Sequence, residues 1–463
     1  MNTKALRQKI LDLAIHGKLV PQDPNDEPAS VLLERIKAEK ERLIKEGKIK
    51  RSKRSKAACD KPHYPFELPK GWCWCKLYDI VEFIGGYAYK SNTYVSKSDY
   101  QVIRIGNVKN DFLNLENLPV FVPETIGNQT AKYRIYENDI LFTMTGTKGK
   151  RDFFFTTVVT KQEKILLLNQ RVGCLRSFST ELNMNYLSML LKGKYILDSI
   201  FSTETGNVSQ GNIGSENTLN LFVALPPYVE QQRIVKKVNS FFDLLNVMEE
   251  RKRKLQDCIH DIKVKILDLA IHGKLVPQDP NDEPASELLK RINPKAEITC
   301  DNPHYRNLPK GWSAVPMQML CSLVDGEKQS GVERINLDVK FLRGEHEAKA
   351  LSAGKYVAAN TLLILVDGEN SGEVFRTPVE GYQGSTFKQL AINDNMYTDY
   401  VLQVINLHRK TLRENKVGSA IPHLNKKLFK AIDVPIPPYE EQQRIVNAIN
   451  KAFTTLDVIT ENL

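Results

Sequence analysis

The sequence lacks three features that would assign it to a specialised class of protein. It contains no run of eighteen apolar residues, so it predicts no membrane-spanning helix. Its first residues, Met1–Arg7, hold no apolar core of the kind that a signal peptide needs, so we expect a cytoplasmic protein. Its seven cysteines are scattered and odd in number, which fits reduced thiols better than a disulfide framework.

Acidic residues are also fewer than basic ones. The chain has 65 Lys and Arg against 55 Asp and Glu, which gives a net charge of +10. This balance favours a polyanionic partner. With 463 residues, of which 41% are hydrophobic, the chain is too long for one ordinary domain and too apolar to be disordered.

The chain contains two copies of one segment, and one copy is divided between the two chain ends. Residues 9–30 and 265–286 are identical, and residues 225–235 (LPPYVEQQRIV) match residues 436–446 (IPPYEEQQRIV). The middle copy is continuous, whereas the other begins near the C-terminus and finishes near the N-terminus. This order indicates a circularly permuted repeat in a two-fold symmetric molecule, which requires the two chain ends to lie close together.

Regular spacing of apolar residues predicts one long helix in the middle copy. From Ile234 to Leu269 they recur, with one exception, at steps of four and three, which is the heptad pattern of a coiled coil. The divided copy keeps this pattern from Ile445 to the C-terminus and again from Leu6 to Leu13. We therefore expect an antiparallel helix pair within the chain. A coiled coil between two separate chains is the alternative.

Glycine and proline mark the ends of these helices. Gly17 and Gly273 follow the last apolar positions, and glycine commonly ends a helix there. Pro28 and Pro284 are expected to open shorter helices soon afterwards.

Two variable blocks lie between the copies, and their short apolar runs predict α+β domains. Extended segments are expected at 102–108, 139–144, 153–159, 337–342 and 361–366, and helices near 181–202 and 396–414. The predicted fold is therefore α+β, with two globular domains separated by a pair of long antiparallel coiled-coil-like helices and a pseudo-two-fold, circularly permuted repeat. The predicted division of the chain is a helical region at 1–56, a domain at 57–225, the long helix at 226–295, a domain at 296–435 and a helix at 436–463.

No motif in the chain amounts to an active site. The two Pro-Pro-Tyr segments resemble a motif of amino-group methyltransferases, but their first residues, Leu225 and Ile436, are apolar and cannot hold the target amino group. The loop 146–150 lacks two positions of a phosphate-binding P-loop. Cys73 and Cys75 have no second cysteine pair to complete a zinc site. We expect no catalytic residue, metal or cofactor in this chain.

The whole chain resembles the specificity subunit of type I restriction-modification enzymes. The resemblance rests on the two P-P-Y-x-E-Q-Q-R-I-V segments, on L-P-K-G-W at 68–72 and 308–312, and on I-L-D-L-A-I-H-G-K-L-V-P-Q at 10–22 and 266–278. It implies two target recognition domains, each reading one half of a bipartite, asymmetric double-stranded DNA site. It also implies that the helices set the gap between the halves and bind two modification subunits, which use S-adenosylmethionine. Restriction subunits would add chemistry that needs ATP and Mg²⁺.

Loops of the variable blocks contain the side chains that such reading requires. Base edges are read mainly by Arg or Lys at guanine and by Asn or Gln at adenine, whereas phosphate contacts position the protein. In the first domain we expect DNA contacts from Tyr89, Lys90, Ser91, Arg104, Asn107, Thr145, Thr147, Lys148, Lys150 and Arg151. In the second we expect them from Lys328, Gln329, Arg343, Asn370, Ser371, Ser385, Thr386 and Lys388. A solvated loop position is the alternative for each residue.

Two segments at the starts of the long helices are candidates for partner binding. We expect contacts with the modification subunits from Gln231, Gln232, Arg233, Gln442, Gln443 and Arg444. The alternative is that these residues cap and bridge within the helix pair. For the whole chain, the alternative function is a non-catalytic coiled-coil scaffold with two protein-binding domains.

Overall fold

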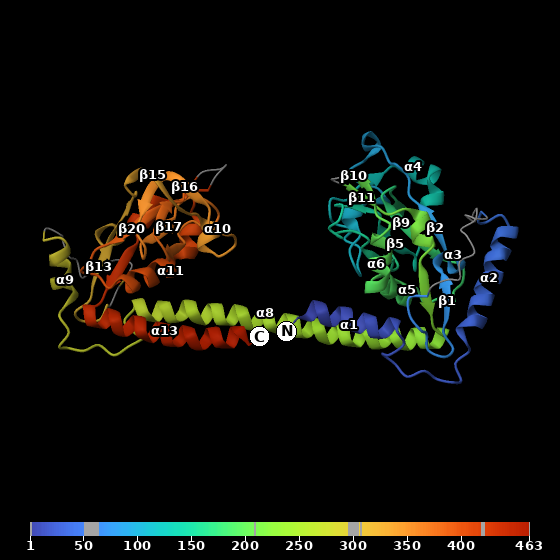
Figure 1. The fold of residues 1–463 in the computed structure, drawn as a ribbon, viewed down its shortest axis with the longest axis horizontal. Helices are drawn as coiled ribbons and strands as arrows, with labels where there is room; N and C mark the ends of the chain where they lie inside the picture. The colour runs from blue at the N-terminus through green and yellow to red at the C-terminus, as the bar shows by residue number, and fades with distance from the viewer. Residues whose placement is uncertain are drawn as a thin grey trace. The chain divides into compact units, whose positions relative to one another are not determined.

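The computed structural model describes residues 2–50, 64–207, 210–294, 305, 308–417 and 422–462. The chain divides into two compact units, Met1–Glu250 and Arg251–Leu463. Each unit contains one domain of helices and sheets together with flanking helices, so the expected α+β fold class is confirmed (Figure 1). The predicted closeness of the two chain ends concerns Met1 and Leu463, which lie outside the described residues.

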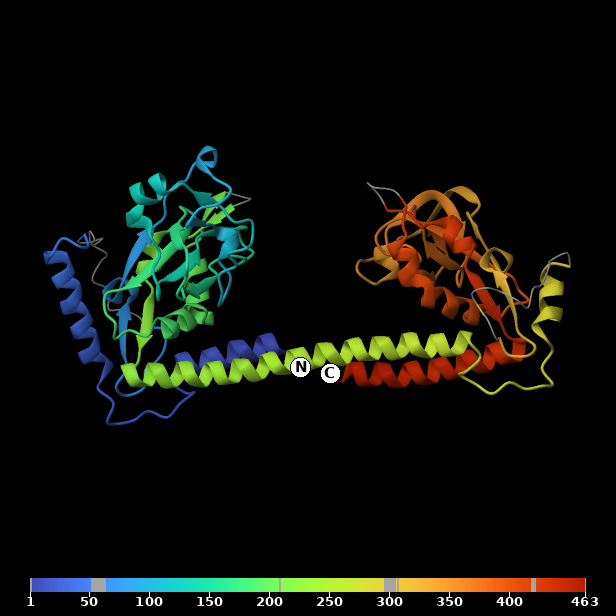
Figure 2. The ribbon, with the colours of Figure 1, turned by 180° about the vertical axis from the view of Figure 1, so that it is seen from behind.

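One helix, α8 (Tyr228–Ile271), belongs to both units and covers the predicted heptad region. In the first unit, α1 (Thr3–Ile15) packs along α8 (Figure 2). Arg7, near the start of α1, pairs with Glu249 at 3.2 Å, while the segment after α1 reaches Glu230 near the start of α8. The two helices therefore run antiparallel.

The second unit repeats this arrangement with the C-terminal helix α13 (Tyr439–Glu461). Lys263 Nζ lies 2.5 Å from Asp457 near the end of α13, whereas Gln278, which follows α8, donates to Glu441 near its start. Both parts of the divided repeat therefore pack antiparallel to α8 within one chain, as predicted.

The apolar face of α8 is only partly buried. Ile234, Val238, Leu245 and Ile259 are buried, whereas Met248, Leu255 and Ile262 are 46%, 40% and 40% exposed. Periodicity alone does not distinguish positions that a partner helix covers from positions that it leaves open.

The predicted helix ends are confirmed. Gly17 follows α1 with φ of +65° and Gly273 follows α8 with φ of +62°, values that glycine adopts without steric cost. The shorter helices α2 (Ala29–Lys45) and α9 (Ala285–Ile292) begin directly after the two predicted prolines.

The first domain is built on an antiparallel sheet of order β2–β9–β5–β7. Its strands are Val81–Gly85, Val172–Ser177, Ile140–Thr143 and Thr156–Val158. A second sheet has the order β4–β3–β8, in which β3 and β8 are parallel, with strands Phe121–Val122, Tyr100–Ile103 and Ile165–Leu168. The start and the end of the domain pair as β1 (Cys73–Lys76) and β12 (Phe222–Leu225).

The second domain has the same strand plan. Its main sheet has the order β14–β20–β17–β18, with strands Cys321–Val324, Phe387–Ile392, Leu362–Leu365 and Val374–Arg376. Its start and end pair as β13 (Ser313–Pro316) and β21 (Asp433–Ile436). The strands β15 (Lys328–Leu337), β16 (Ala350–Val357) and β19 (Gly381–Gln383) pair with one another, and β15 and β19 are parallel. The two domains are therefore two diverged copies of one scaffold.

Three sequence expectations were wrong in whole or in part. The strand expected at 102–108 ends at Ile103, and Ile105–Asn107 form a 3-10 turn instead. The helix expected near 181–202 is broken into α5 (Met184–Leu191) and α6 (Lys194–Phe201). The strand expected at 337–342 is replaced by α10 (Val339–Leu342), because the Asp338 side chain accepts a hydrogen bond from Phe341 N and starts a helical turn. The helix expected near 396–414 is confirmed as α11 (Thr398–Glu414).

The remaining elements are short. The helices are α3 (Leu77–Ile80), α4 (Glu124–Gln129), α7 (Ser215–Leu219) and α12 (Lys426–Lys430). The 3-10 turns are Ser91–Thr93, Ile105–Asn107, Ala131–Tyr133 and Met317–Met319, and the strands are β6 (Thr145–Gly146), β10 (Thr205–Asn207) and β11 (Gln210–Asn212). No helix in these described ranges is long and apolar enough to cross a membrane.

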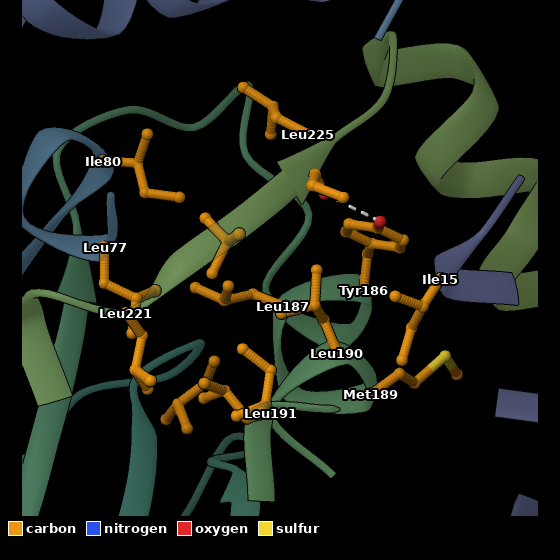
Figure 3. Packing of buried hydrophobic residues seen from close by; sticks show 14 of the residues in the cluster. Ile15, Leu77, Ile80, Tyr186, Leu187, Met189, Leu190, Leu191, Leu221 and Leu225 are labelled. Atoms are coloured by element: carbon orange, nitrogen blue, oxygen red, sulfur yellow. Dashed lines mark hydrogen bonds between the residues drawn. The ribbon is translucent and has the colours of Figure 1, made fainter. Parts of the chain in front are cut away.

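The core of the first unit joins the first domain to α1. Tyr186 of α5 is buried, and its hydroxyl donates to Ala224 O of β12 at 2.9 Å (Figure 3). Ile15 at the end of α1 lies beside Met189 of α5 (Figure 3). A Cβ at Gly193 would lie 2.1 Å from Ile15 Cδ1 and 3.0 Å from Leu190 O, so a larger residue at this position would displace the Ile15 side chain. The helix and the domain of this unit therefore share one hydrophobic core.

Candidate DNA interface

In each domain a turn with glycine follows the central strand of the main sheet. The first glycine turn, Thr145–Arg151, follows β5, and the second glycine turn, Asp367–Gly372, follows β17. Both turns contain residues that the sequence predicts for DNA contact. Predictions that were made separately for the two domains therefore fall at equivalent positions of the shared scaffold.

Internal contacts hold most of the first glycine turn in place. Lys148 Nζ donates to Gly206 O at 2.8 Å, and the Arg151 guanidinium pairs with Asp198 at 2.6 Å. Lys150 is exposed and has no ion-pair partner among the described residues. It is therefore the cation of this turn that is most available to a phosphate. The predicted contacts Thr145 and Thr147 are half-buried beside it.

The Arg104–Asn107 segment supports a neighbouring loop. Asn107 is 2% exposed, and its amide donates to Asn114 O at 3.0 Å and Asn117 O at 2.9 Å. Its Oδ1 accepts from Arg104 N, and the Arg104 guanidinium donates to Leu118 O at 2.6 Å. A base edge cannot reach the buried Asn107 amide, so the expected direct contact is corrected to a supporting role.

The Tyr89–Ser91 segment contains one buried and two exposed residues among its predicted DNA contacts. Tyr89 is buried, its hydroxyl donates to Thr130 Oγ1 at 3.1 Å, and burial raises the pKa of its phenol. Its direct contact is therefore also corrected, whereas Lys90 and Ser91 are exposed. Sequence reasoning missed Tyr87, which is 42% exposed and has its ring centroid 5.0 Å from that of Tyr89. The Tyr-x-Tyr spacing of residues 87 and 89 is the sequence pattern that could have pointed to Tyr87.

In the second domain, most predicted contacts have accessible side chains. The exposed or half-buried ones are Lys328, Gln329, Asn370, Ser385 and Thr386. Ser371 differs, because it is fully buried and its hydroxyl has no hydrogen-bond partner among the described residues. A base cannot reach Ser371, so a direct contact is not proposed for it.

Two predicted cations of this domain are paired with carboxylates. Arg343 pairs with Glu373, and Lys388 Nζ lies 2.5 Å from Asp325. Lys355 and Lys388 lower the pKa of the Asp325 carboxyl. Each pair is partly exposed, so a phosphate can compete for the cation only at the cost of an existing ion pair.

The start of α8 lies in a polar cluster, which we call the first junction. The buried carboxylate of Glu230 accepts from Trp72 Nε1 at 3.0 Å and from Gln22 Nε2 at 3.1 Å. Burial raises the pKa of Glu230. One turn further on, Arg233 pairs with Asp26. Three segments distant in sequence meet here.

The second junction has the same contacts at the start of α13. Glu441 accepts from Trp312 Nε1 at 3.0 Å and from Gln278 Nε2 at 3.1 Å, and burial raises its pKa. Arg444 pairs with Asp282 at 2.6 Å. The divided repeat therefore reproduces the geometry of the continuous one.

Four of the six predicted partner contacts bridge within their own unit. Gln231 is buried and accepts from Asn183 N at 3.0 Å, while the buried Gln442 accepts from Tyr397 N at 3.0 Å. The two arginines form the junction ion pairs. Partner binding remains a prediction for the exposed side chains, which are Gln232 and Gln443.

A groove along α8 extends from Gln232. It begins beside the start of α5 and follows one face of the helix in the first unit. Its lining residues are Asn183, Gln232, Val235, Lys236, Asn239, Ser240, Asp243, Leu244 and Val247. Leu244 and Val247 are 58% and 44% exposed, which gives this face an apolar character.

Comparisons with known proteins agree with this architecture. The family model described as "Type I restriction modification DNA specificity domain" matches residues 69–257 and 336–463. The EcoAI specificity subunit of Escherichia coli is 27% identical over 98% of this chain and 89% of its own length. The EcoEI specificity subunit of the same species is 30% identical over 62% of this chain and 54% of its own length. A protein solved in work on complex assembly and conformational transition of the type I R-M system shares the fold. It has a TM-score of 0.57 at 16% identity, and the match covers 86% of this chain and 94% of that one.

Proposed function

This chain belongs to the type I restriction modification DNA specificity family, and we propose that it reads a bipartite, asymmetric DNA site through its two recognition domains. The observation that carries the proposal is the equivalence of the two glycine turns. One strand plan occurs twice, and the turns present different side chains, such as Lys150 in the first domain and Asn370 in the second. A repeated scaffold with different exposed residues can read two different half-sites.

In this proposal the long helix sets the gap between the half-sites. α8 is one continuous helix of 44 residues that belongs to both units. A continuous helix changes length only by whole residues, at about 1.5 Å each. The length of the gap would therefore be fixed by the protein and would not depend on the DNA sequence between the half-sites.

The junctions support a role in binding two identical partners. Their buried contacts are the same, and each presents one exposed glutamine, Gln232 or Gln443. We propose that two modification subunits bind these equivalent surfaces and that restriction subunits join the complex. S-adenosylmethionine, ATP and Mg²⁺ would then bind on those partners, in the cytoplasm, and this chain would supply recognition without catalysis.

Sequencing of methylated adenines in host DNA tests the proposal. With the gene present, methylation should occur at one bipartite, asymmetric motif, and deletion of the gene should remove it. A coiled-coil scaffold predicts the opposite result, because its loss would leave the methylated motif unchanged. Unaltered methylation after deletion would therefore favour the scaffold.

A further inference from the structure

The hairpin formed by β10 and β11 is fixed to the first glycine turn. The three strands form a small sheet of order β10–β11–β6, in which Gly211 lies opposite Gly146. A Cβ at Gly211 would lie 1.8 Å from Glu204 Oε1 and 3.2 Å from Lys148 Cα. The Glu204 carboxylate also accepts from Gly149 N at 3.2 Å. Glycine at position 211 therefore allows the hairpin to lie directly on the turn.

Two amide side chains project from this hairpin. Gln210 and Asn212 flank Gly211 on β11, and both are exposed while Gly211 is buried. Alternate residues of a strand face the same side, so these two side chains lie side by side, roughly 7 Å apart. Within the described part of the chain, neither amide has a hydrogen-bond partner. Both are therefore free to bond to a ligand.

Their chemistry and spacing fit the major groove of DNA. A two-stranded ribbon fits into this groove, and the amide of Asn or Gln pairs with N6 and N7 of adenine. A separation of roughly 7 Å is about twice the spacing of successive bases, which is about 3.4 Å. We infer that Gln210 and Asn212 read two bases of the first half-site, two steps apart. This inference rests on the proposed function.

The second domain supports its corresponding segment in the same way. Directly after the hairpin, the buried Ile213 donates from its backbone N to Met144 O at 3.0 Å. In the second domain, the buried Leu424 likewise donates from its backbone N to Val366 O at 2.7 Å, at the end of the central strand. The residue before each of these is Asn212 in the first domain and His423 in the second. A constant support with different exposed residues is what two different half-sites require.

The test replaces Gln210→Ala and Asn212→Ala separately in the full chain, assembled with its modification subunits. Sequencing of methylated adenines should then show methylation at sites that differ from the wild-type motif at one base of the first half-site. Loss of one bidentate contact should relax discrimination at that base by about tenfold or more. The two variants should relax different positions, and the second half-site should not change.

Asn220→Ala is the matched control, because Asn220 is an exposed amide beyond the hairpin, after α7. It should leave the motif unchanged. If both hairpin variants assemble and keep the wild-type motif, or if they relax the second half-site, the inference is overturned. If the proposed function itself were wrong, the wild-type complex would already show no bipartite methylated motif, so the two failures can be told apart.

Discussion

Burial separates the predicted DNA contacts at the scale of single residues. Tyr89, Asn107 and Ser371 are buried, whereas Lys90 and Lys150 are exposed. The buried side chains use their polar groups to hold loops in place, or lie where no base can reach them. The exposed ones are the side chains that can meet DNA, so the two groups should respond differently to mutation.

Asn107→Ala should destabilise the first unit. It removes three hydrogen bonds of a buried amide and leaves Asn114 O and Asn117 O with fewer partners. We expect the free energy of unfolding to fall by about 1–3 kcal/mol, measured by chemical denaturation. Lys90→Ala, at an exposed position, serves as the control and should change it by less than about 0.5 kcal/mol. Equal stability of the two variants would contradict the supporting role of Asn107.

Lys150→Gln should weaken DNA binding through loss of one phosphate contact. The slope of log affinity against log salt should become shallower by about one unit, because one fewer counterion is released. The measurement is a salt titration of the assembled complex on duplex DNA. Lys9→Gln, an exposed change of the same charge on α1, is the control and should leave the slope unchanged. An unchanged slope for Lys150→Gln would remove this lysine from the interface.

At the scale of elements, the two junctions give the long helices fixed starting points. Each buries a glutamate that accepts hydrogen bonds from a tryptophan and a glutamine. The burial that raises the pKa of Glu230 and Glu441 also makes their ionised forms costly. We therefore expect the junctions to contribute to the pH dependence of stability.

This pH dependence has a definite sign. For a carboxyl whose folded pKa is raised, the stabilisation is fully present below the ordinary glutamate pKa of about 4.3 and is lost as pH rises through the raised value. Glu230→Gln and Glu441→Gln remove the titration but keep the size of the side chain. The melting temperature of the wild type, relative to the double variant, should therefore fall as pH rises from about 4 to 7. A difference that stays constant with pH would show that these carboxyls do not titrate in the folded protein.

The elements also show what sequence could and could not predict. Heptad spacing and the glycines at 17 and 273 predicted the long helices and their ends, because both depend on local pattern and backbone geometry. The segment after Leu337 was predicted as a strand from its apolar residues, but the Asp338 side chain caps a short helix there. The paired hairpin on the first glycine turn depends on contacts between residues about 60 positions apart. No local pattern encodes such a pairing, so Gln210 and Asn212 were missed.

At the scale of the whole molecule, one chain combines two diverged domains with one repeated helical support. The identical segments 9–30 and 265–286 lie at the two junctions, while the domains share a strand plan and differ in their exposed turns. In the proposed function the domains read the sequence and α8 sets the gap. These two properties should therefore be separable by mutation.

Lengthening α8 should change only the gap. Seven residues inserted between Met248 and Leu255, where the apolar face is exposed, lengthen the helix by about 10 Å. At about 3.4 Å per base pair, the gap in the methylated motif should widen by about three base pairs. The same seven residues inserted after Gly47, beyond the end of α2, should leave the gap unchanged. An unchanged gap with the longer α8 would contradict its assigned role.

Exchange of one domain tests the central claim most directly. Residues 73–224 run from the start of β1 to near the end of β12, so they can be replaced by the corresponding block of a related specificity subunit. The measurement is sequencing of methylated adenines in cells that carry the exchanged chain. We expect a new first half-site, with the second half-site and the gap both retained. A change in both half-sites would contradict this expectation, because reading by the two domains would then not be independent.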